Sequence, residues 1–147
     1  MFKENKEKDY IIIAGCGQLG SKIAEDMSNE RKSIVVIDKD EKAFQLISDN
    51  FSGFTIEADV TEEDTLILAN VKKAGMFFAT TDNDNTNIMI AEIAKYIYNV
   101  PIVVARVYET GRHDVYKKLG IDTISPIQLS SYEFKKIITD RENNQWI

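Results

Sequence analysis

Tyr10-Ile11-Ile12-Ile13-Ala14-Gly15-Cys16-Gly17-Gln18-Leu19-Gly20 is the stretch of this 147-residue chain that decides its fold. An apolar run leads directly into a Gly-x-Gly-x-x-Gly turn, and a helical pattern follows. The three glycines act differently, since Gly15 permits a tight turn, Gly17 lets a pyrophosphate approach the backbone, and Gly20 lets helix and strand pack closely. The first N–H groups of the helix then face the phosphates. The stretch therefore predicts a strand, turn and helix that bind a nucleotide.

Short apolar runs alternate with helical patterns along the chain. The runs are residues 10–14, 34–37, 54–56, 76–79, 102–105 and, more weakly, 123–124. The helical patterns are residues 18–28, 41–49, 62–70, 83–98 and 109–119, with a last one after residue 126. Most runs are continuous rather than alternating, which is typical of strands covered on both faces. We therefore expect an α/β, Rossmann-like, doubly wound parallel sheet of six strands in the order 3-2-1-4-5-6, with a C-terminal crossover helix.

The length fits one domain. We expect a frayed N-terminus over residues 1–9, a nucleotide-binding domain over 10–139 and a polar tail over 140–147. No stretch resembles a linker between domains.

Several residues predict where helices begin and end. Thr61 and Asp64 have the spacing of a capping box. Asp82 and Asn83 precede an apolar helix and can cap it. Gly120 is a helix stop, since glycine tolerates the left-handed conformation that ends many helices.

Composition excludes several classes of protein. The net charge of −6 argues against binding a nucleic-acid backbone, which attracts basic surfaces. One cysteine and one histidine are too few for a typical zinc site. No apolar run approaches the roughly 20 residues that span a bilayer, and the first residues lack the apolar stretch of a signal peptide. These features predict a cytoplasmic protein without a metal and without direct membrane insertion.

An acidic residue follows the second apolar run. Asp38 lies 18 residues after Gly20, close to the spacing of the carboxylate that binds ribose hydroxyls in dinucleotide sites. A carboxylate there repels a 2′-phosphate, so NAD or an adenosine nucleotide is favoured over NADP. The alternatives are a glycine turn without a ligand and a solvated carboxylate. Cys16 is interpreted as a small filler residue, since a redox role needs a lowered thiol pKa.

Four segments beyond the glycine turn carry a family resemblance. They are Glu57-Ala58-Asp59-Val60-Thr61-Glu62-Glu63-Asp64-Thr65-Leu66, Ala79-Thr80-Thr81-Asp82-Asn83-Asp84-Asn85-Thr86-Asn87, Val104-Ala105-Arg106-Val107 and Lys118-Leu119-Gly120-Ile121-Asp122-Thr123-Ile124-Ser125-Pro126. In this order they resemble the N-terminal nucleotide-binding domain, the RCK or TrkA-N domain, of Trk/Ktr-type potassium uptake regulators. The similarity runs from about residue 10 to about residue 130.

The resemblance implies roles for matching residues. Asp59 would recognise the adenine edge with Ala58 near the ring, and Arg106 would face the phosphates, although a surface ion pair is the alternative for Arg106. The sequence and the resemblance together predict these nucleotide-binding residues: Gly15, Gly17, Gln18, Leu19, Gly20, Asp38, Lys39, Ala58, Asp59, Ala79, Thr80, Asp82 and Arg106. No catalytic residue is predicted.

Two positions depart from the family pattern. Many members carry Arg where this chain has the neutral Gln18, so phosphate contact is weaker or the preferred nucleotide differs. Glu57 stands where Gly is usual. Members also usually continue into a smaller C-terminal ligand-binding lobe, which these 147 residues do not include.

The last helical pattern is rich in apolar residues, namely Ile127, Leu129, Tyr132, Phe134, Ile137 and Ile138. In the family this helix crosses to a partner subunit, which implies a homodimer or a larger ring. Packing of the helix on its own domain is the alternative.

The resemblance implies a regulatory function. The chain would be a cytoplasmic domain that controls a membrane-embedded potassium channel or transporter, with NAD(H), ATP, ADP or AMP as an allosteric ligand. The alternative is a small NAD-dependent oxidoreductase or its cofactor-binding domain. An oxidoreductase needs a positioned proton donor, and His113 is the single histidine.

Overall fold

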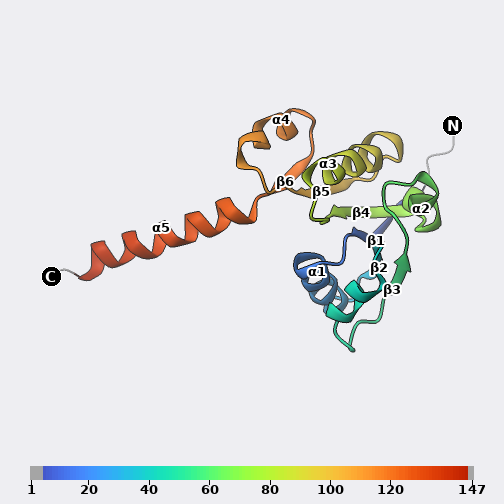
Figure 1. Cartoon of the computed structure of the whole chain (residues 1–147), viewed down its shortest axis with the longest axis horizontal. Coiled ribbons are helices and arrows are strands. Elements are labelled where there is room, and N and C mark those ends of the chain that lie inside the picture. Colours follow the sequence, from blue (N-terminus) through green and yellow to red (C-terminus); the bar gives the residue numbers. More distant parts are fainter. Residues whose placement is uncertain (1–4, 146–147) are drawn as a thin grey trace.

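Six parallel strands form one sheet in the computed structural model, which describes residues 5–145. The strands are β1 (Glu7–Ala14), β2 (Ser33–Asp38), β3 (Phe54–Glu57), β4 (Ala74–Ala79), β5 (Ile102–Arg106) and β6 (Asp122–Ile124). Their order is β3-β2-β1-β4-β5-β6 (Figure 1). The predicted fold class and strand order are confirmed.

The connecting segments are helices, several of them short. The α-helices are α1 (Gln18–Asn29), α2 (Glu63–Leu68), α3 (Asp84–Glu92), α4 (His113–Lys118) and α5 (Pro126–Gln145). The 3-10 helices are η1 (Glu41–Leu46), η2 (Val71–Lys73) and η4 (Thr110–Arg112), and the π-helix η3 (Ile93–Ile97) continues α3.

Two hydrophobic clusters cover the two faces of the sheet. Ile11 and Ile13 of β1 are fully buried among residues of α1 and η1. Ile12 and Ala14 are equally buried, on the opposite face among residues of α2 and α3. Because neighbouring side chains of a strand point to opposite faces, both sets must be apolar. This is why the strands are continuous apolar runs.

The carboxyl ends of the central strands lie at one edge of the sheet. Ala14 pairs with Ile37 in β2 and with Ala79 in β4, and Ala79 pairs with Ala105 in β5. The residues that come next in the chain therefore meet at this edge. In open α/β sheets this is the edge where ligands bind.

The first strand begins earlier than the apolar run. Residues 1–4 lie outside the described residues, but Glu7–Ala14 is strand and Glu7 pairs with Ala74. The prediction of a frayed end over residues 1–9 is therefore wrong for 7–9. Main-chain pairing and a 2.5 Å ion pair between Asp9 and Lys32 hold these polar residues.

Some predicted helix ends differ. The predicted helix over 41–49 is a 3-10 helix that ends at Leu46, because Ile47 is extended. The predicted capping box does not form, because the Thr61 hydroxyl donates to Asp59 at 2.7 Å. Asn83 does cap α3, accepting from the Thr86 N–H at 2.9 Å. The predicted stop at Gly120 is confirmed, since its φ is +72°.

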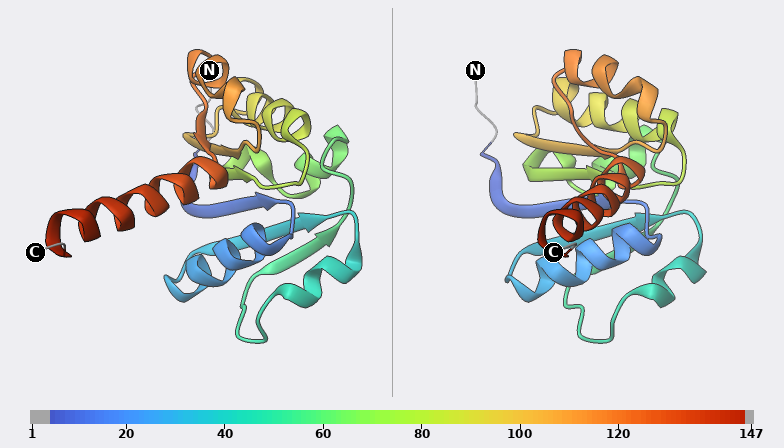
Figure 2. Two further views of the ribbon diagram at one scale, coloured as in Figure 1. Left: turned by 60° about the vertical axis from the view of Figure 1, so that its left-hand side comes forward. Right: turned by 90° about the vertical axis from the view of Figure 1, so that its left-hand side faces the viewer.

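The last helix, α5, leaves the domain and projects away from the sheet (Figures 1 and 2). It runs through residue 145, so the predicted polar tail begins inside it, and residues 146–147 lie outside the described residues. Since α5 projects away from the sheet, the alternative that this helix packs on its own domain is wrong. Its apolar side chains are exposed, and Phe134 is 71% exposed. Within residues 5–145, none of the helices combines the length and apolar character needed to cross a membrane.

Candidate functional site

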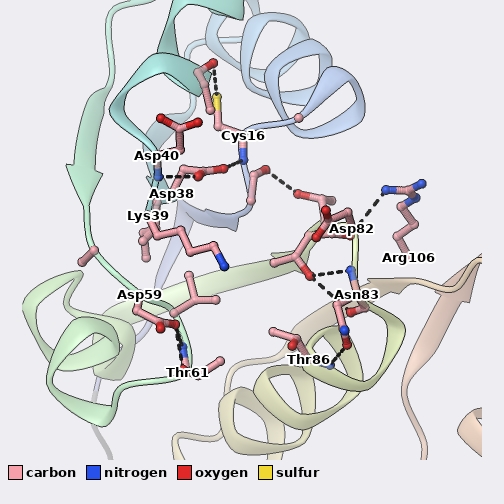
Figure 3. A pocket seen from close by; sticks show the side chains of 18 of the residues that line it. Cys16, Asp38, Lys39, Asp40, Asp59, Thr61, Asp82, Asn83, Thr86 and Arg106 are labelled. Atoms are coloured by element: carbon pink, nitrogen blue, oxygen red, sulfur yellow. Dashed lines mark hydrogen bonds between the residues drawn. The ribbon is translucent and has the colours of Figure 1, made fainter.

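A cavity of about 560 Å³ opens at the carboxyl edge of the sheet (Figure 3). It is bounded by the ends of β1, β2, β4 and β5 and by the loops after β2, β3 and β4. Its lining residues are Gly15, Cys16, Gly17, Ile37, Asp38, Lys39, Asp40, Ala43, Leu46, Ala58, Asp59, Val60, Thr61, Thr80, Thr81, Asp82, Asn83, Thr86 and Arg106.

The glycine turn leaves no room for side chains where the two halves of the sheet meet. Gly15 has φ +112°, and a Cβ there would lie 2.6 Å from the Thr81 nitrogen. A Cβ on Gly20 would lie 1.9 Å from the Gly15 oxygen and 2.8 Å from the Thr80 hydroxyl. A Cβ on Gly17 would meet nothing within 4 Å. Gly15 and Gly20 are therefore structural requirements, while Gly17 keeps the space above the turn open.

Asp38 is held by the backbone around it. Its two carboxylate oxygens accept hydrogen bonds from the Cys16 N–H at 2.9 Å and from the Asp40 N–H at 2.8 Å. The carboxylate thus ties the end of β2 to the glycine turn. Both oxygens keep further lone pairs for a ligand.

Asp59 is fixed in the same way on the loop after β3. Its Oδ1 accepts from the Thr61 hydroxyl at 2.7 Å and from the Thr61 N–H at 2.9 Å. These bonds, with a smaller contribution from the charge of Lys39, hold the pKa of Asp59 below its usual value. The carboxylate is therefore ionised at neutral pH and acts as an acceptor. Figure 3 shows Lys39 reaching between Asp59 and the opposite side of the cavity.

Arg106 supplies positive charge on the opposite side of the cavity. Its Nη1 donates to the Thr81 carbonyl at a long 3.4 Å, and its guanidinium lies 5.6 Å from the ring centre of Tyr108. Its Nε is buried and has no hydrogen-bond partner among residues 5–145. Over the same residues Arg106 forms no ion pair, so the surface ion pair considered for it is not found. The guanidinium therefore has unused donors beside the cavity.

Five apolar residues make up part of the cavity lining, and we call this part the apolar slot. The slot is lined by Ile37, Ala43, Leu46, Ala58 and Val60. Leu46 is 55% exposed, so its side chain is accessible to a ligand in the cavity. The slot can accept a flat, apolar ring with a polar edge.

Most of the predicted site residues lie together. Nine line the cavity: Gly15, Gly17, Asp38, Lys39, Ala58, Asp59, Thr80, Asp82 and Arg106. Four do not: Gln18, Leu19, Gly20 and Ala79. Of the residues that sequence reasoning missed, Thr81 lies between the predicted Thr80 and Asp82, and Thr86 lies one helical turn after Asp82. Leu46 carries no sequence signal, because only the end of η1 brings it to the cavity.

Cys16 faces away from the open side of the turn. It is fully buried, and its thiol donates to the Ala43 carbonyl at 3.4 Å. Burial, with a smaller effect of the Asp38 charge, raises the pKa of Cys16 to about 11. A protonated, buried thiol fits the predicted filler role.

Known proteins resemble this chain in sequence. The sequence model of the TrkA-N domain matches residues 11–126. A Trk system potassium uptake protein TrkA from Streptomyces coelicolor is 34% identical over 119 residues, which are 81% of this chain. The chain spans about half, 53%, of that relative's length.

Solved structures share the fold. A crystal structure of GsuK bound to ADP has a TM-score of 0.79 at 21% identity, over 95% of this chain and 36% of that chain. A GsuK channel bound to NAD has a TM-score of 0.66 at 13% identity, over 86% of this chain and 22% of that chain.

Proposed function

This chain belongs to the TrkA-N domain family, and we propose that its cavity binds an adenosine nucleotide that regulates a potassium channel or transporter. The observation that carries the proposal is one cavity lined by two backbone-anchored carboxylates and by an arginine with unused donors. Ribose, base and phosphate each find a matching chemical group there.

Asp38 is the residue we assign to the ribose. Its carboxylate is already oriented by the Cys16 and Asp40 N–H groups, so it can accept from the ribose hydroxyls without rearranging. A 2′-phosphate would be repelled by Asp38 and by Asp40, both of which line the cavity. The site therefore favours NAD(H), ATP, ADP or AMP over NADP.

Asp59 and the apolar slot are assigned to the base. A planar base buries its faces against the slot residues, which include Leu46 and Ala58. Its exocyclic amine can donate to the free oxygen of Asp59, whose other oxygen is held by Thr61. Guanine has a carbonyl in place of that amine, so in the same orientation it would present an acceptor to the carboxylate. We therefore expect the slot to prefer adenine.

The phosphates would lie over Gly17, at the start of α1 and within reach of Arg106. The open space at Gly17 and the N–H groups of the first helical turn favour an anion there. Gln18 is neutral and does not line the cavity, whereas Arg106 does. Arg106 would therefore supply the positive charge that an arginine at the position of Gln18 supplies in many family members. ADP and NAD, named with GsuK structures, share the adenosine diphosphate group that these contacts recognise.

The relatives and α5 support a regulatory role. The Streptomyces relative is named a Trk system potassium uptake protein, and α5 exposes apolar residues that a second copy of the chain can cover. In the proposal, a cytoplasmic homodimer or larger ring joined through α5 responds to the nucleotide and acts on a membrane-embedded partner. Light scattering tests the dimer: a strict monomer at high protein concentration contradicts it.

An oxidoreductase has less support. His113, the single histidine, does not line the cavity, and its Nδ1 lies 2.7 Å from the Thr123 hydroxyl. Turnover of NADH with a simple carbonyl substrate would favour this alternative over the regulatory role.

The experiment for the proposed function is a thermal-shift series with NAD, NADH, ATP, ADP and AMP. Wild type should be stabilised by at least one of them, because a ligand that binds only the folded state raises the melting temperature. NADP should give a smaller shift than NAD. No shift with any of the adenosine nucleotides would contradict nucleotide binding.

A further inference from the structure

Asn87, on α3, is fully buried and does not line the cavity. Among residues 5–145, its side-chain amide nevertheless bonds only to Thr81 and Arg106, and both line the cavity. Oδ1 accepts from the Thr81 N–H at 2.9 Å and from the Thr81 hydroxyl at 2.5 Å. Nδ2 donates to the Thr81 carbonyl and to the Arg106 carbonyl, each at 3.0 Å. Both amide hydrogens and the amide oxygen are therefore used.

These bonds join two separate parts of the cavity. Thr81 follows β4 and Arg106 ends β5, and Asn87 connects their backbones from behind. The Thr81 carbonyl that Asn87 holds is also the acceptor for the Arg106 guanidinium. A buried amide with all its partners fixes their relative position, because losing any of them leaves a buried polar group unsatisfied. The place of the guanidinium thus depends on Asn87.

We propose that Asn87 is a positioning residue for the phosphate end of the nucleotide. The inference rests on the proposed function, and it adds a residue that touches no ligand. Without the amide, the loop after β4 and the Arg106 backbone would separate, and the guanidinium would lose its fixed direction. Asp38 and Asp59 are held by other bonds and would stay in place. Phosphate recognition should therefore weaken while adenosine recognition persists.

Asp84 offers a matched control on the same helix. Its carboxylate accepts from the Tyr108 N–H at 2.7 Å and from the Glu109 N–H at 2.8 Å. It therefore also ties α3 to the segment after β5, but neither of its partners lines the cavity. Replacing Asp84 removes comparable helix-to-loop bonds without freeing Thr81 or the Arg106 carbonyl.

The test compares Asn87→Ala with Asp84→Ala by calorimetric titration of ADP and of adenosine. Circular dichroism first sets a temperature at which every protein is folded. Asn87→Ala should bind ADP about tenfold more weakly, in line with the loss of buried hydrogen bonds, and adenosine within about threefold of wild type. Asp84→Ala should bind both ligands within about threefold of wild type. In amide hydrogen exchange, the Thr81 N–H should be protected in wild type and lose protection in Asn87→Ala.

A milder variant keeps the proposal testable if Asn87→Ala does not fold. Thr81→Val removes the hydroxyl bond to Asn87, together with the longer contacts of that hydroxyl with the Asn83 carbonyl and N–H at 3.2 and 3.3 Å, and keeps the backbone bonds that Asn87 makes to Thr81. It should weaken ADP binding by about threefold. Unchanged ADP affinity in the folded variants would overturn the inference, as would an equal loss of ADP and adenosine affinity or an equal effect of Asp84→Ala. A wild type that binds neither ligand would overturn the proposed function and the inference together.

Discussion

The two sides of the cavity are built differently. On the side of β2 and β3, Asp38 and Asp59 each accept two hydrogen bonds from neighbouring groups, at 2.7–2.9 Å. On the side of β5, Arg106 has one long contact of 3.4 Å and a buried Nε without a partner among residues 5–145. Figure 3 shows Asp38 and Asp59 on one side of the cavity and Arg106 on the other, with Asp82 between them. We call them the carboxylate side and the arginine side.

The difference indicates how recognition is divided. Groups that are already oriented cost little to bind a ligand, whereas a group with unused donors gains its bonds only when the ligand arrives. The carboxylate side should therefore select the nucleoside, and the arginine side should respond to the phosphates. Nucleotides that differ in their phosphates would then be distinguished mainly by the arginine side.

The largest effect is expected where the two sides join. Gly20→Ala places a Cβ 1.9 Å from the Gly15 oxygen, a backbone atom that cannot move freely. Overpacking that shifts backbone typically costs about 1–3 kcal/mol of unfolding free energy, and we expect the upper end of that range here. Urea denaturation followed by circular dichroism measures this loss.

Gly17→Ala is the control for the glycine turn. Its Cβ meets nothing within 4 Å, so its unfolding free energy should stay within about 0.5 kcal/mol of wild type. The new methyl group stands where the phosphates would approach, and ADP affinity should fall. Equal stability of the Gly20→Ala and Gly17→Ala proteins would contradict the packing described for the turn.

The next largest effect is expected from a substitution on the carboxylate side. Asp38→Ala leaves the Cys16 and Asp40 N–H groups without their acceptor and deletes the acceptor for the ribose. Affinity for adenosine and for ADP should fall alike, by about tenfold to a hundredfold. Calorimetric titration of both ligands measures it. A loss confined to ADP would mean that Asp38 does not contact the nucleoside.

A smaller and selective effect is expected on the arginine side. Arg106→Gln removes the positive charge but keeps a donor near the Thr81 carbonyl. ADP affinity should fall about tenfold at low salt and less at high salt, since added ions screen the interaction. Adenosine affinity should not change. If adenosine binding weakens as much as ADP binding, the division between the two sides is wrong.

The sequence predicted the carboxylate side better than the arginine side. Asp38 and the glycines stand at fixed spacings within one strand–turn–helix unit, and local sequence determines their geometry. The arginine side depends on Asn87, which brings Thr81 and Arg106 together through bonds between separate segments. Asn87 ends the second of the segments that carry the family resemblance, but its place in the sequence does not reveal its hydrogen-bond partners. Leu46 was missed for the same reason, because the short η1 helix places it.

The smallest effect concerns Cys16, behind the carboxylate side. Its pKa is raised to about 11 from an ordinary 9.0, so the folded thiol keeps its proton where the unfolded one loses it. Stability should be unaffected below pH 9 and should fall as the pH rises from about 9 towards 11. Urea denaturation across this range, with Cys16→Ala as the control, measures the fall. A thiol that reacts rapidly with alkylating reagents at pH 8 would contradict its burial.

Calorimetric titration of the wild-type protein with ADP and GDP tests nucleotide recognition most directly. ADP should bind saturably at one site per chain, and GDP should bind at least about tenfold more weakly because its base presents a carbonyl to Asp59. Absence of ADP binding, or equal affinity for the two nucleotides, would contradict an adenosine site in this cavity.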